Sequence, residues 1–86
     1  MPRISKFYGI AIYMYYRDHA PPHFHAIYGE DEALIEIATG TILAGDLPRR
    51  GRALVEDWRQ AHLAELQQNW NQAIASQPLQ KIDPIT

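Results

Sequence analysis

Three of the four histidines in this 86-residue sequence lie within seven positions, in the segment 18–25, which reads DHAPPHFH. The Pro-Pro pair fixes φ at two successive residues and removes two backbone donors, and the residue before each proline is driven toward extended geometry. We therefore expect a rigid loop that leads into a strand beginning at His23. In a strand, His23 and His25 point to one face and Phe24 to the other, which makes an imidazole pair backed by an apolar anchor.

A His-x-His pair on one strand face is half of a typical site for zinc or another divalent transition metal. Its third ligand would come from His19, Asp18 or Glu36, and we take His19, His23 and His25 as the candidate metal set. The alternative is that the histidines are surface or hydrogen-bonding residues and that the protein holds no cofactor. The fourth histidine, His62, lies on an apolar stripe, where a partly buried structural role is the favoured interpretation.

The same residues also suggest metal-independent cleavage of RNA, which needs a base for the 2′-hydroxyl, an acid for the leaving oxygen and cations for the phosphorane. His25, oriented by Glu36, would be the base, and His23 or His19 the acid. The candidate cations are Arg17, Arg49 and Arg50. Arg49, Arg50 and Arg52 also lie at an expected helix N-terminus, where free amides favour phosphate, and the tyrosines, Tyr15 among them, would stack on bases. The competing interpretations are a solvated first helical turn and ordinary sheet packing.

A third interpretation makes the chain a binding module without chemistry of its own. Short edge strands, an aromatic-rich sheet and an apolar tail can pair with another small protein by strand addition or tail docking. Removal of the imidazoles separates this interpretation from an enzyme: an enzyme should lose its function while keeping its fold, whereas a binding module should mainly lose its partner.

Composition limits these choices. Hydrophobic residues make up 47% and charged residues 21%, as in ordinary folded domains, and the net charge of −2 argues against a non-specific nucleic-acid coat. There is no cysteine, so disulfides and thiolate chemistry are excluded. No run of apolar residues approaches a membrane span and no signal segment is visible, so we expect a cytoplasmic protein with one domain over residues 1–86.

Alternating apolar residues predict the sheet. We expect strands over 8–17, 23–28 and 33–37, a turn at 29–32, and a fourth short strand over 41–44. If the apolar sets of the second and third strands share a face, Phe24 lies opposite Ile37 and His25 opposite Glu36. On this reading the histidines face away from the core.

From Pro48 to about Ser76 the pattern becomes helical, with a single apolar stripe formed by Val55, Trp58, His62, Leu66, Trp70 and Ala73. This length is unusual on a small sheet, so we expect a kink or a break near residues 61–63. The predicted fold is α+β: an antiparallel sheet of three to four strands, then one kinked or two C-terminal helices packed on one face. The β-rich part is 1–46, the helical part 47–77 and the tail 78–86, either packed at the domain edge or held for a partner.

Two stretches, RISKFYG at 3–9 and DHAPPHFHA at 18–26, resemble the small bacterial family known as domain of unknown function 4160. The similarity continues through Leu47-Pro48-Arg49, Trp58, Asn69-Trp70 and Lys81-Ile82, and so covers nearly the whole chain. Members of this family are commonly encoded beside another small domain, in an arrangement similar to toxin–antitoxin modules. The resemblance therefore implies a paired bacterial stress or defence protein.

From residues and resemblance together, we predict a component of a toxin–antitoxin-like two-gene module, on the effector side and acting as an RNA-directed nuclease through His23 and His25. The alternative is a non-enzymatic module that binds a partner or a metal, as an antitoxin or accessory protein. Either way we expect a small protein partner encoded nearby, a homo-oligomer or hetero-complex, and no membrane contact, with RNA as a further ligand of the effector.

Overall fold

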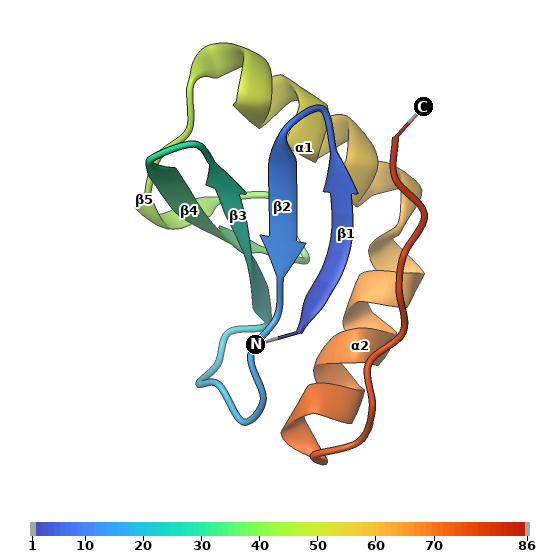
Figure 1. Ribbon diagram of the computed structural model, residues 1–86. Helices are drawn as coiled ribbons and strands as arrows, with labels where there is room; N and C mark the ends of the chain where they lie inside the picture. The colour runs from blue at the N-terminus through green and yellow to red at the C-terminus, as the bar shows by residue number, and fades with distance from the viewer. Residues whose placement is uncertain (1, 86) are drawn as a thin grey trace.

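A computed structural model describes residues 2–85 and shows one antiparallel sheet followed by two helices (Figure 1). The five strands pair in chain order, each with its sequence neighbour. The elements are β1 (Arg3–Phe7), β2 (Ile10–Tyr13), β3 (His23–Tyr28), β4 (Asp31–Glu36), β5 (Ile42–Gly45), α1 (Arg49–Ala61) and α2 (Leu63–Ile74). The α+β class and the C-terminal helices are confirmed, whereas the expectation of three to four strands is wrong by the additional strand β1.

The missing strand arises from a tight hairpin inside the alternating segment predicted as one strand over 8–17. Tyr8 and Gly9 both adopt left-handed backbone angles, with φ of 48° and 80°, as a two-residue hairpin turn requires. The chain therefore reverses there, and Phe7 pairs with Ile10. Only 10–13 of the predicted strand forms β2, and the rest becomes turn and loop.

The β3–β4 hairpin is tighter than predicted. Tyr28 pairs with Asp31 across a two-residue turn in which Gly29 has a φ of 62°, so the ladder is shifted by two residues from the predicted register. Because strand side chains alternate, a two-residue shift keeps the same residues on the core face, and Phe24 lies opposite Ile35. The predicted pairing of His25 with Glu36 is wrong, since His25 lies opposite Leu34.

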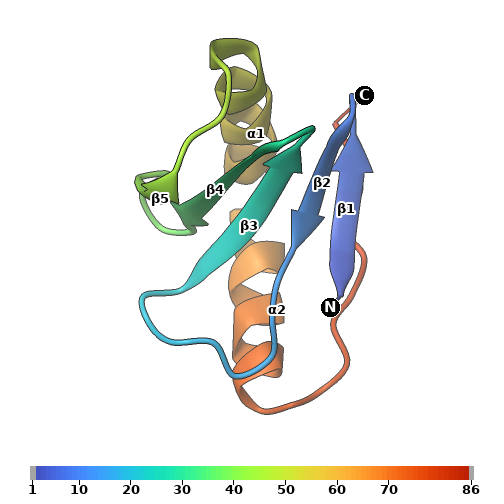
Figure 2. The same cartoon turned by 60° about the vertical axis from the view of Figure 1, so that its left-hand side comes forward.

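Both helices lie on one side of the sheet, as the rotated view in Figure 2 shows. The predicted break is confirmed at His62, which separates α1 from α2. Trp58 is fully buried at the centre, with its ring 5.4 Å from that of Phe7 and 5.6 Å from that of Phe24. Arg59, which is not among the residues of the predicted apolar stripe, is also buried.

The C-terminal tail packs along the domain edge, beside β1 and α2 (Figure 1). The Ile82 amide donates to the Ile4 carbonyl at 2.8 Å, and the Trp58 indole donates to the Asp83 carbonyl at 2.9 Å. Asn69 exchanges two hydrogen bonds with the Gln80 backbone. Within residues 2–85, neither helix has the length and apolar character needed to cross a membrane.

Candidate metal centre

His23 and His25 stand side by side on β3 and are both buried. They alternate with Phe24, as predicted, but only 1% of His23 and 8% of His25 is exposed, so the expectation of an exposed histidine face is wrong. The reason is the segment between β2 and β3, which folds back over the start of β3. The Tyr15 ring meets His25 edge-on at 4.3 Å, and the His23 ring lies 5.3 Å from that of Trp70.

Arg17 anchors that segment. Its backbone adopts a left-handed φ of 55°, its amide donates to the Ala73 carbonyl at 3.2 Å, and its Nε donates to Ser76 Oγ at 2.8 Å. The loop is thereby tied to the C-terminal end of α2, and the next residue, Asp18, turns its carboxylate toward β3. Arg17 was predicted to be a catalytic cation, but its guanidinium is directed at Ser76.

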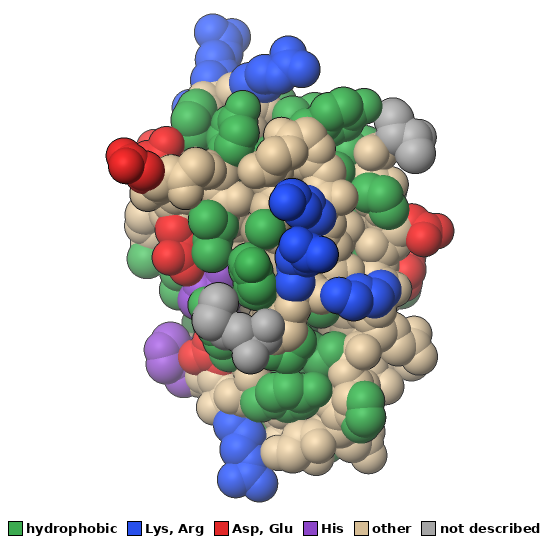
Figure 3. Space-filling model, viewed as in Figure 1, with side chains coloured by type: hydrophobic (Ala, Val, Ile, Leu, Met, Phe, Trp, Pro, Cys, Tyr) green, Lys and Arg blue, Asp and Glu red, His purple; other side chains and the backbone are tan. Residues whose placement is uncertain are grey.

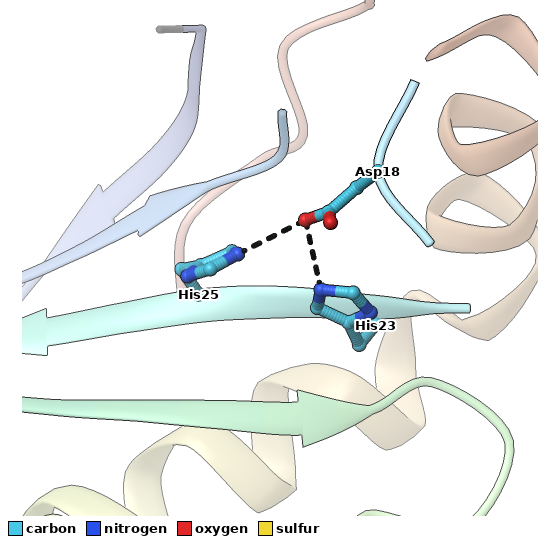
Figure 4. A group of neighbouring side chains, drawn as sticks. All are labelled: Asp18, His23 and His25. Atoms are coloured by element: carbon cyan, nitrogen blue, oxygen red, sulfur yellow. Dashed lines mark hydrogen bonds and ion pairs between the residues drawn. The ribbon is translucent and has the colours of Figure 1, made fainter. Parts of the chain in front are cut away.

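The Asp18 carboxylate meets both histidines through the same oxygen (Figure 4). Asp18 Oδ2 lies 3.0 Å from His23 Nε2 and 3.4 Å from His25 Nε2. One ligand atom from each of the three residues lies within 4.8 Å of the others. Among residues 2–85 this is the one group of three or more such side chains with metal-ligand spacing.

The hydrogen bond made by Nδ1 of each histidine determines whether Nε2 of the neutral ring carries a proton or a lone pair. His23 Nδ1 lies 2.8 Å from the Pro21 carbonyl, which can only accept, so Nδ1 donates its proton there. His25 Nδ1 lies 3.0 Å from Glu32 Oε2 and donates in the same way to that carboxylate. In a neutral imidazole, Nε2 then carries a lone pair, and both lone pairs point at a carboxylate oxygen that also only accepts. A proton or a cation is needed between them.

The local electrostatics favour the charged carboxylate. Burial raises the pKa of Asp18, but the His19 amide, which donates to the carboxylate, and the close contacts with His25 and His23 outweigh it, so the pKa lies below its ordinary value. The pKa of Tyr15 is raised, first by burial and then by the charge of Glu32. Asp18 is thus an anionic candidate ligand, and the phenol of Tyr15 remains protonated.

The spacing of the donor atoms suits a metal ion. Two ligands bound about 2.1 Å from one ion lie roughly 3.0 to 3.4 Å apart in octahedral or tetrahedral geometry. The contacts from Asp18 to His23 and His25 are 3.0 Å and 3.4 Å. Ligating histidines also usually donate their second N–H to a carboxylate or carbonyl, as the Pro21 carbonyl and Glu32 permit here.

The remaining candidates of the histidine segment lie outside this set. His19 is 83% exposed and its ring is 5.8 Å from that of His23, so Asp18 rather than His19 completes the group. Glu36 pairs with His23 along the backbone, but its carboxylate accepts from Thr39 Oγ1 at 2.9 Å. Glu36 was predicted to be the partner of His25. Because the register is shifted by two residues, Glu32 contacts His25 instead.

The arginines predicted to bind phosphate are at the other end of the sheet. Arg49, Arg50 and Arg52 occupy the first turn of α1, and Arg50 lines a shallow hollow with Tyr28 and Gly29 at the β3–β4 turn. β3 runs from His23 to Tyr28, so its length separates the two groups. Figure 3 shows basic side chains gathered at the top, over the start of α1, and histidine side chains well below them at the left. They do not form one site.

His62 occupies the break between α1 and α2. Its ring lies 5.7 Å from that of Trp58 at a tilt of 46°, and its Nδ1 lies 2.6 Å from Glu65 Oε1. It belongs to no group with metal-ligand spacing in the described chain. This placement agrees with the structural role predicted for it.

Together these observations define a small α+β protein with a carboxylate and two histidines gathered at the start of its central strand. A family model described as Domain of unknown function (DUF4160) matches residues 9–71, and the chain belongs to this family. The chain has no significant match among curated proteins or among solved structures.

Proposed function

We propose that this protein binds a divalent transition-metal ion, with zinc as the first candidate, through Asp18 Oδ2, His23 Nε2 and His25 Nε2. The observation that carries the proposal is the convergence of two imidazole nitrogens on one carboxylate oxygen, each imidazole oriented by an acceptor behind it. Imidazole and carboxylate donors suit zinc and iron(II). Three protein ligands also leave a coordination position for water or a small molecule.

Metal binding is favoured over metal-independent RNA cleavage because of burial and placement. A general acid or base must touch its substrate, but His23 is 1% exposed and both of its ring nitrogens already have partners. The arginines that would stabilise a phosphorane lie at the far end of β3. The role in a two-gene toxin–antitoxin-like module, which came from the family resemblance, stays a prediction that fits a metal-binding component equally well.

The test is a titration of metal-free protein with zinc, followed by calorimetry, and with cobalt(II), followed by its visible spectrum. We expect one equivalent to bind. At a free zinc concentration one hundred times the dissociation constant, binding adds about 2.7 kcal/mol to the free energy of unfolding. Asp18→Asn keeps the size of the side chain and should weaken binding by about a hundredfold or more.

The matched control is His19→Ala, which removes the neighbouring exposed histidine and should bind as the wild type does. Circular dichroism of each metal-free variant establishes that it is folded. Failure of the folded wild type to bind zinc, iron(II) or cobalt(II), or equal binding by Asp18→Asn, would refute the metal site.

The effector prediction has a separate test, because it concerns the cell. Growth and total-RNA integrity are followed after induced expression of the wild type and of folded Asp18→Asn in a bacterium. Growth arrest with RNA loss in the wild type alone would tie toxicity to this site. Normal growth with both would favour the non-enzymatic alternative.

A further inference from the structure

The sheet face opposite the helices has a regular pattern of side chains across its strands. The observed registers place Lys6, Ala11, Ile27 and Glu32 in one row across β1 to β4. The next row is Arg3, Tyr13, His25 and Leu34. Each row therefore begins with a cation on β1 and continues through apolar or aromatic groups on β2 and β3; on β4 the first row ends at Glu32 and the second at Leu34.

This outer face is polarised. Its middle is formed by the half-exposed side chains Ala11, Tyr13, Ile27 and Leu34, while Lys6 is exposed at one side and Glu32 at the other. Figure 3 shows hydrophobic side chains between a basic group over β1 and acidic side chains over β4. An apolar strip with Lys6 at one side and Glu32 at the other is complementary to itself.

We propose that a second copy of this chain docks on the outer face, about a two-fold axis that runs parallel to the strands between β2 and β3. Such an axis exchanges β1 with β4 and β2 with β3. Lys6 then faces Glu32 of the second copy, and Ala11 faces Ile27. An axis perpendicular to the strands would instead set β1 against β1 and bring the lysines together, so charge selects the first arrangement.

The strand edges are poorer docking sites than this face. The tail covers the free edge of β1, where the Ile82 amide donates to the Ile4 carbonyl and Lys81 donates to the Arg3 carbonyl. β5, at the other edge, has four residues and ends at Gly45, whose φ is 70°. A short strand with a left-handed end offers little ladder for strand addition.

The same two-fold axis has a consequence for the second row. Since β2 exchanges with β3, Tyr13 of the second copy lies over His25. Dimer formation would then cover the 8% of His25 that remains exposed. The docking proposal itself does not depend on metal binding, because it follows from the strand registers and the charges.

The experiment is analytical ultracentrifugation of the full chain in EDTA over a hundredfold concentration range. We expect a species of twice the 9.9 kDa chain mass. Lys6→Glu turns two attractive pairs into two repulsive ones and should raise the dimer dissociation constant by about tenfold or more. The double variant Lys6→Glu/Glu32→Lys reverses both charges and should restore it.

The control is Arg50→Glu, an equal change of charge on an exposed residue of α1, which should leave the dissociation constant unchanged. Circular dichroism melts confirm the fold of each variant. A wild type that stays monomeric throughout the range overturns the proposal, and so does a dimer that Lys6→Glu does not weaken. Because EDTA is present throughout, these outcomes are independent of the metal titration.

Discussion

Two polar groups of this protein, the pair that buried Arg59 forms with half-buried Glu56 and the Asp18–His23–His25 cluster, differ in how their hydrogen-bond donors and acceptors match. Arg59 donates from Nε and Nη2 to the Glu56 carboxylate at 2.8 Å and 2.6 Å, and from Nη1 to the Ile37 carbonyl at 2.7 Å. Each of these contacts joins a donor to an acceptor. All three guanidinium nitrogens thus have an acceptor, and the pair joins α1 to Ile37, just after β4.

The histidine cluster places an acceptor oxygen at both ring nitrogens of each imidazole. The Pro21 carbonyl and Glu32 take the Nδ1 protons, and Asp18 Oδ2 faces both Nε2 atoms. The comparison teaches that burial and proximity alone do not separate a structural polar group from a binding site. The count of donors against acceptors does, because a surplus of acceptors leaves a place for a further proton or a cation.

The largest effect that would test this comparison is expected from Arg59→Met, which keeps the volume of the side chain and removes all its donors. The Ile37 carbonyl loses its partner, so we expect about 2 to 3 kcal/mol less stability, measured by urea unfolding with tryptophan fluorescence. Metal affinity should not change. Arg52→Met is the control, since the Arg52–Asp46 pair is 3.7 Å long and exposed, and its loss should cost less than about 0.5 kcal/mol. Equal losses in the two variants would contradict a structural role for Arg59.

A smaller effect is expected from Gly40→Ala, because Gly40 lies against the same pair. Its φ is 78°, and an added Cβ would lie 2.9 Å from Arg59 Nε and still closer to Glu56 Oε1. We expect a loss of about 2 kcal/mol, from the left-handed backbone and from displacement of the pair. Gly29→Ala is the control, since its φ is 62° with no atom within 4 Å of an added Cβ, and it should cost about 1 kcal/mol. If Gly29→Ala costs as much, the contact with the pair contributes nothing.

Glu32→Gln tests the histidine cluster. It removes the charge behind His25 and should weaken zinc binding by about tenfold, as loss of a second hydrogen-bond partner of a metal-ligating histidine typically does. The unfolding free energy without metal should change little, because the Glu32 carboxylate is 45% exposed. Calorimetric titration measures the affinity. Glu36→Gln is the control and should bind zinc as the wild type does, since Glu36 accepts from Thr39 instead. If Glu36→Gln weakened zinc binding more than Glu32→Gln does, the result would support the hairpin register predicted from sequence, in which His25 lies opposite Glu36.

The difference between Glu32 and Glu36 shows how far the sequence alone leads. Period-two alternation fixed which residues of β3 and β4 face the core, because a shift of two residues preserves the faces. It could not fix the length of the turn, which depends on Gly29 adopting a φ of 62°. The core set was therefore predictable, while the partner of His25 was not.

The other missed features depend on contacts between distant segments. β1 was hidden because Tyr8, a residue that rarely adopts left-handed angles, begins the first turn with a φ of 48°. The burial of His23 depends on the loop that Arg17 ties to Ala73 and Ser76. Arg59 is buried because Ile37 and Glu56 supply acceptors, which a pattern of apolar residues does not reveal. The helix break at His62 was predictable because it follows from helix length and local pattern.

The smallest predicted effect is the pH dependence of Glu56→Gln. Hydrogen bonding from Arg59 is the main reason that the pKa of Glu56 lies below its ordinary value of 4.5, although burial opposes it. A lowered pKa in the folded state means that the carboxylate stabilises the fold above about pH 4.5 and loses this contribution as the pH falls through the folded-state pKa.

Glu56→Gln should thus cost less than about 1 kcal/mol at pH 7, since the Glu56 side chain is 38% exposed and solvent screens the pair. The difference from wild type should shrink below pH 4.5 as the wild-type carboxylate becomes neutral. Urea unfolding at pH 7, 5, 4 and 3 measures it, with Glu30→Gln in the exposed β3–β4 turn as the control. A difference that stays constant or grows toward pH 3 would mean that the charge of Glu56 does not support Arg59. The contrast between the arginine pair and the histidine cluster would then rest on the hydrogen bond from Arg59 to the Ile37 carbonyl alone.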